Sequence, residues 1–152
     1  MVQTTAEGRQ QLLDTVAEAT EYIGFALASL GAAYEQLDVT HADELEEQLF
    51  RPVQLAYGRA RRMHAEFARR HGLASRSFEA PAAGLPSIGV KAFIENAVVA
   101  VGKADNALAG LQDSMLPVEV GDPELRAGLA DLRGLVGGTA KRAREVVRTI
   151  GR

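Results

Sequence analysis

The chain contains no cysteine. This absence excludes thiolate catalysis, iron–sulfur clusters and zinc sites with cysteine ligands, and it fits a reducing compartment. With 152 residues, the chain has the usual size of one domain and can bury a core without a disulfide or metal staple. We therefore expect a single cytoplasmic domain over residues 1–152.

Long apolar runs and an export signal are also missing. The first residues, MVQTTAEGRQQLLD, mix polar and charged side chains where a secretory signal needs a basic start and an apolar centre. The charge-free run from Tyr22 to Tyr34 is shorter than the roughly 20 residues of a membrane-spanning helix. We expect a soluble protein without a membrane partner. Its formal net charge of -3 argues weakly against a dedicated nucleic-acid binder.

The residue patterns of the common helical metal sites are absent. No Glu-x-x-His occurs, and His41, His64 and His71 contain no pair at i, i+4, so neither a di-iron carboxylate site nor a helical zinc site is expected. Glu44 and Glu47 share a helix face, but the Glu-x-x-Asp partner that helical magnesium pyrophosphatases use does not follow. The dipole of a helix start explains this acidic pair without a metal.

Enzymatic motifs of other kinds are missing as well. The sequence has no glycine-rich phosphate loop and no serine in a nucleophile-elbow context. We therefore expect no cofactor, no metal and no catalytic centre of these types.

Helical periodicity is the strongest signal that the sequence does contain. Apolar residues recur at alternating steps of three and four through four segments, and none shows sustained strand alternation. Asp122 and Pro123 form the best start signal, with a capping side chain before a proline at the first helical position. We predict four helices, and Pro52 should kink the second. Their approximate ranges are 5–37, 41–71, 87–115 and 122–150.

The connections between these segments suggest an architecture. Short links make successive helices antiparallel neighbours, so the sequence predicts an all-α, up-down-up-down four-helix bundle. The link over residues 73–87, between the second and third helices, is long and rich in alanine, proline, glycine and serine. It is the one connection with the length of a functional or mobile loop.

Arginine is concentrated towards the carboxyl ends of the second and fourth helices. In an up-down-up-down bundle these ends meet at one pole, where a basic surface could hold an anionic partner, either phosphate-bearing or an acidic protein. The dipole of a helix end attracts cations only over its last turn, and the arginines cover more than that. The predicted anion-binding residues are Arg59, Arg61, Arg62, Arg69, Arg70, Lys141, Arg142, Arg144 and Arg148.

Two residues of the second helix carry a resemblance to a known family. Arg59 and His64 form Arg-x-x-x-x-His, which resembles the short motif of HEPN-type ribonucleases, small helical bundles that often dimerise. The resemblance implies that His64 and Arg59 act on an RNA phosphodiester. The other interpretation of His64 is a structural histidine at the edge of the core.

The charge-free stretch of the first helix suggests an interface. One side of it belongs to the core stripe, whereas Phe25, Ala28 and Ala32 lie on the opposite side; Val98 and Val99 interrupt the polar side of the third helix in the same way. Two helices with uncharged outer centres indicate a surface that a partner covers. These five residues are the predicted oligomer interface.

We therefore expect a non-enzymatic binding or assembly module that forms a homo-oligomer, with a homodimer as the simplest case. Two alternatives remain open. One is a nucleic-acid-directed or RNA-cleaving protein that uses the basic pole, and the other is a small-ligand binder with a core cavity lined by Tyr22, Tyr34, Tyr57 and His64.

Overall fold

All regular structure between residues 5 and 151, the part of the chain that the computed structural model describes, is helical. Residues 1–4 and 152 of the predicted domain lie outside the described residues. The elements are α1 (Thr5–Glu35), α2 (Val39–Leu45), a π-helical turn η1 (Glu46–Phe50), α3 (Arg51–Arg70), a 3-10 turn η2 (Pro86–Ile88), α4 (Val90–Asp113), α5 (Leu116–Val120), α6 (Pro123–Val136) and α7 (Thr139–Ile150).

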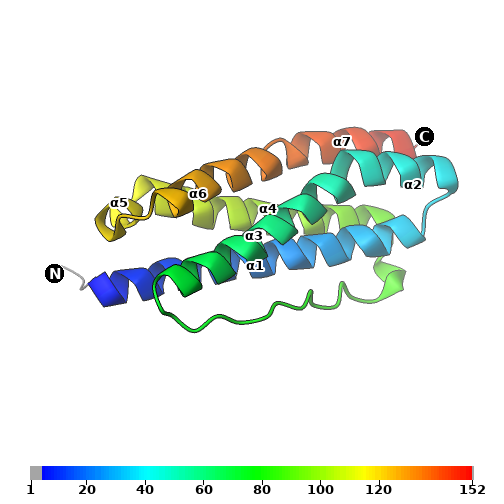
Figure 1. The fold of residues 1–152 in the computed structure, drawn as a ribbon. Helices are drawn as coiled ribbons and strands as arrows, with labels where there is room; N and C mark the ends of the chain where they lie inside the picture. Colours follow the sequence, from blue (N-terminus) through cyan, green and yellow to red (C-terminus); the bar gives the residue numbers. More distant parts are fainter. Residues whose placement is uncertain (1–4, 152) are drawn as a thin grey trace.

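The long helices pack side by side around one core (Figure 1). Helix α1 packs against α3 and α4, and α6 packs against the same two helices from the other side. Each of these neighbours runs antiparallel to the helix that it contacts. The prediction of an all-α chain with antiparallel packing and a loop between the second and third helices is confirmed.

The predicted up-down-up-down order is wrong, because α3 and α4 run in the same direction (Figure 1). Residues 73–85 contain no helix and return along the whole bundle before α4 begins. At about 3.3 Å per extended residue this segment reaches about 43 Å, close to the ~46 Å of the 31-residue α1. A link of this length allows α4 to run in the same direction as α3. The observed order is up-down-down-up.

Three contacts fix the path of this returning loop. Arg76 forms an ion pair with Glu21 in α1, the ring of Phe78 lies edge-on to His64 in α3 at 5.0 Å, and Gln36 Nε2 donates to the carbonyl of Pro86 at 2.8 Å. The loop therefore lies along α1 from the end of α3 to the start of α4.

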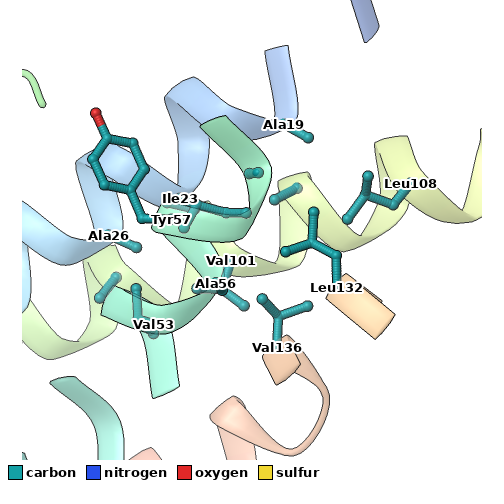
Figure 2. Packing of buried hydrophobic residues seen from close by; sticks show 14 of the residues in the cluster. Ala19, Ile23, Ala26, Val53, Ala56, Tyr57, Val101, Leu108, Leu132 and Val136 are labelled. Atoms are coloured by element: carbon teal, nitrogen blue, oxygen red, sulfur yellow. The ribbon is translucent and has the colours of Figure 1, made fainter. Parts of the chain in front are cut away.

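Side chains from α1, α3, α4 and α6 meet in the core (Figure 2). Helices α1 and α3 approach closely at Gly24, where an added Cβ would lie 2.9 Å from the Tyr57 ring. Only glycine leaves room for that ring. This contact explains one glycine of the uncharged stretch in α1 by packing within the bundle.

Pro52 coincides with the irregular part of the second helical segment. It has no N–H for the carbonyl of Gln48, four residues earlier, and the π-helical turn η1 ends just before it. The Gln48 carbonyl accepts a hydrogen bond from Arg142 Nε of α7 at 2.8 Å. The predicted kink region is therefore a place where α7 is tied to the second segment.

The predicted fourth helix is interrupted. Gly138 has a left-handed φ of 80°, and Gly137 ends α6 by donating its N–H to the Arg133 carbonyl. Thr139 Oγ1 caps a further carbonyl, that of Val136, at 2.6 Å. The glycine pair thus separates α6 from α7. Among residues 5–151, no helix is long and apolar enough to cross a membrane.

Candidate functional site

The outer face of α4 is the most open apolar surface near the predicted interface. Val99 keeps 57% of its surface exposed, whereas Val98 is partly buried against the core. Val99 lines grooves on both sides of α4, so it forms a ridge between them. We call this ridge and its two grooves the α4 face.

The groove between α4 and α7 has a volume of about 700 Å³. Ile94 and Val98 from α4 and Ala143 and Val147 from α7 supply its apolar lining. Its charged residues are Lys91, Glu95, Arg144 and Arg148. The sequence analysis named Arg144 and Arg148 as anion-binding residues and did not predict this groove.

The groove between α1 and α4 has a volume of about 510 Å³. Phe25 and Val99 both line it, together with Pro81 of the returning loop, so the structure brings predicted interface residues from two helices to one place. Phe25 and Ala32 are partly buried and packed against the core, and Ala28 is also partly buried. Part of the uncharged side of α1 is therefore covered by its own chain.

The predicted anion-binding residues do not form one pole. Because α6 and α7 run opposite to the direction expected from the sequence, α7 lies at the far end of the bundle from the end of α3 (Figure 1). Arg69 and Arg70 are in the last turn of α3, whereas Lys141, Arg144 and Arg148 are on α7. The geometry that suggested a shared basic surface is absent.

Carboxylates pair with Arg59 and Arg70 of α3. Arg59 forms an ion pair with Asp131 of α6. Arg62 and Arg70 line the same α3–α6 groove, of about 240 Å³, and Glu66, Glu124 and Asp131 line it as well. Elsewhere, the guanidinium of Arg61 lies over the Tyr57 ring at 4.6 Å. Arg59, Arg61 and Arg70 therefore make contacts within the chain.

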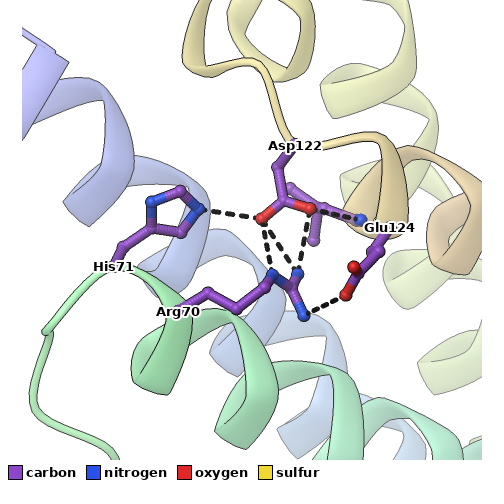
Figure 3. Close-up of polar contacts among 5 residues, drawn as sticks. Arg70, His71, Asp122 and Glu124 are labelled. Carbon is purple, nitrogen blue, oxygen red and sulfur yellow. Dashed lines mark hydrogen bonds and ion pairs between the residues drawn. The ribbon is translucent and has the colours of Figure 1, made fainter.

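Asp122 is the centre of the most connected polar cluster (Figure 3). It is only 4% exposed and caps α6 by accepting from the Leu125 N–H at 2.9 Å. Arg70 donates to both of its oxygens at 2.9–3.1 Å, and His71 Nε2 lies 2.8 Å from Oδ2. Arg70 also pairs with Glu124 at 2.9 Å.

The charge of Asp122 is stabilised by these contacts. Burial alone would raise the pKa of Asp122, but the hydrogen bonds from Leu125, His71 and Arg70 lower it below its usual value of 3.8. Both carboxylate oxygens are occupied. The cluster therefore connects the end of α3 to the start of α6. From the sequence, only the role of Asp122 as a helix cap was predicted.

Arg59 and His64 do not come together as a catalytic pair. Arg59 faces Asp131 on α6, whereas His64 is 2% exposed and lies under Phe78 of the loop. Its Nδ1 is buried without a hydrogen-bond partner. The ring is therefore enclosed in the core, away from the arginine with which it shares the short motif.

The other residues considered for a ligand cavity lie apart. Tyr22 lines the α1–α4 groove, Tyr57 packs against Gly24, and Tyr34 is 39% exposed near the end of α1. Within residues 5–151, no group of three or more histidine, aspartate or glutamate side chains could hold a metal ion.

The environment of His64 predicts a pH dependence of stability. Burial lowers the pKa of His64 below its usual 6.5, and the charge of Asp14 opposes this shift in part. The unfolded chain therefore takes up a proton near pH 6.5 while the folded chain resists it, so stability is lost as the pH falls from there towards the folded-state pKa.

We expect the urea midpoint of the wild-type chain to fall between about pH 7.5 and about pH 5.5, and the fall to be smaller in His64→Leu. Equilibrium denaturation followed by circular dichroism at each pH measures both. An equal fall in the two proteins would contradict the lowered pKa of His64 as the cause.

The described part of the chain is an all-α helical bundle in which Val99 of the α4 face is exposed. No protein-family model, curated protein or solved structure matches the sequence or the fold.

Proposed function

We propose that this chain is a non-enzymatic helical-bundle module that forms a homodimer through the α4 face. The observation that carries the proposal is the exposure of Val99 on a ridge between two grooves with apolar lining. A single exposed valine would need no explanation. A valine continuous with two apolar grooves is a patch of the kind that partners cover.

A second copy of the chain is the partner that this face fits. The face carries charges of both signs: besides Lys91, Arg144 and Arg148 in the α4–α7 groove, Glu95 and Lys103 lie on either side of Val99 along α4. An anionic or cationic partner would meet a like charge at one of these two positions. A second copy offers the same apolar patch and both charges, as isologous interfaces require.

The use of the polar residues supports a non-enzymatic role. The candidates for chemistry are occupied inside the chain, since Arg59 and Arg70 pair with carboxylates and His64 is enclosed. The open surface that remains is apolar at its centre, which suits association better than catalysis.

Val99→Glu tests the proposal. It places a charge at the centre of the dimer contact, whose burial without a partner is strongly unfavourable, and it leaves the core untouched. We expect light scattering after size exclusion to give a mass of about twice 16.2 kDa for the wild type and the monomer mass for the variant. Phe25 and Val98 are poorer choices, because both are packed against the core.

The matched control is Val118→Glu. Val118 lies on α5, away from the α4 face, and is 50% exposed, so the same substitution there should leave the dimer intact. Circular dichroism checks that both variants keep the helical content of the wild type. A Val99→Glu variant that remains dimeric would refute the proposed interface.

A further inference from the structure

Two charged residues of α4, one acidic and one basic, lie at equal distances along the helix from Val99. Glu95 lies four residues before Val99 and Lys103 lies four residues after it. Both are exposed, and on an α-helix positions four apart share a face. Glu95 lines one groove of the α4 face and Lys103 lines the other.

This arrangement distinguishes between the two orientations of a helix pair. If two α4 helices met in parallel, Glu95 would face Glu95 and Lys103 would face Lys103. If they met antiparallel with Val99 at the centre, Glu95 of each copy would lie beside Lys103 of the other. The parallel pair places like charges together, and the antiparallel pair makes two opposite-charge contacts.

Two glycines on this side of α4 permit a close approach of a second helix. Gly102 and Gly110 are exposed on the same side of α4 as Val99, and neither has an atom within 4 Å of the place where a Cβ would lie. With small residues there, two helices can approach to about 8–10 Å. Lys103 Nζ lies 5.7 Å from the centre of the Tyr22 ring, so its ammonium group is on the α1 side of Val99.

We infer that two copies of this chain pair α4 against α4 in antiparallel orientation, on a two-fold axis that passes beside Val99, with reciprocal Glu95–Lys103 ion pairs. This inference rests on the proposed dimer and specifies its geometry. The axis makes each ion pair occur twice, so any change to one residue acts twice.

Cysteine cross-linking tests the geometry, because the chain has no cysteine of its own. In Val99→Cys the two introduced thiols meet at the axis, and a mild oxidant should convert most of the protein to a disulfide-linked dimer. The matched control is Asn106→Cys, which is exposed on the same helix. In the antiparallel pair its two copies are about 21 Å apart along the axis, so it should stay uncross-linked.

Charge exchange tests the ion pairs. Glu95→Lys alone and Lys103→Glu alone each create two like-charge contacts and should weaken the dimer on the order of tenfold. An equimolar mixture of the two variants should form a heterodimer with wild-type affinity, because each lysine then meets a glutamate. The double variant Glu95→Lys/Lys103→Glu should also recover the wild-type affinity.

The outcomes separate this inference from the proposed function. A dimeric wild type that cross-links at position 99 but not at 106, with rescue in the mixture, supports both. A dimer that cross-links at 106, or at neither position, or whose affinity ignores the charge exchange, overturns the antiparallel α4 pair while the homodimer stands. A wild type that is monomeric throughout overturns both.

Discussion

Asp122→Ala is expected to lower the free energy of unfolding by about 2–3 kcal/mol. Loss of the helix cap on the Leu125 N–H accounts for about 1 kcal/mol. The lost charge-assisted bonds from Arg70 and His71 account for a further ~1.5 kcal/mol or more. Arg70 is 24% exposed, so water partly solvates it after the change and limits the loss. Urea denaturation followed by circular dichroism measures the difference.

Asp122→Asn separates the cap from the ion pair. Asparagine caps a helix about as well as aspartate, so the variant loses only the charge and should be destabilised by about 1 kcal/mol. Because the pKa of Asp122 is lowered in the folded state, its contribution is present above pH ~4 and is lost as the pH falls through the folded-state value. The gap between wild type and Asp122→Asn should therefore close in acid. A gap that persists unchanged would contradict the ion-pair assignment.

Gly24→Val is expected to destabilise the chain by about 2 kcal/mol, because its side chain overlaps the Tyr57 ring. The Cβ alone would lie 2.9 Å from a ring carbon, and Tyr57 is buried, so one helix must shift or the ring must leave its rotamer. Thermal or urea denaturation measures the loss.

Gly58→Val is the matched control for this packing effect. Gly58 is in α3 beside Tyr57, and no atom lies within 4 Å of the place of its Cβ, so the same substitution should cause little or no loss. The double variant Gly24→Val/Tyr57→Leu should be more stable than the sum of the single effects, since the shorter side chain makes room. Additive losses would show that contact with the Tyr57 ring is not the reason why position 24 requires glycine.

The helices could be predicted from the sequence because their apolar periodicity reflects a core that each of them faces. The predicted first helix, 5–37, differs from α1 (Thr5–Glu35) only at its end, and the start signal at Asp122 marks the cap of α6. Local breaks were predicted less well. The predicted third helix, 87–115, ends earlier, at Asp113, and the predicted fourth helix, 122–150, is interrupted at Gly138.

The relative directions of the helices could not be predicted, and the predicted basic pole depended on them. A loop that is long enough to turn back on itself is also long enough to cross the bundle, and its contacts, such as that of Phe78 with His64, are not encoded by periodicity. In the observed order, Arg59 pairs with Asp131 of α6. The end of α3 and helix α7, which carry other predicted basic residues, lie at opposite ends of the bundle. Val99 could be identified from sequence, because its place on the outside of α4 depends only on the period of one helix.

Sedimentation equilibrium of the wild-type chain at micromolar concentrations tests the proposed homodimer most directly. The account predicts a mass of about twice 16.2 kDa, falling towards the monomer mass on dilution as a reversible dimer dissociates. A mass of 16.2 kDa across the whole micromolar range would contradict it.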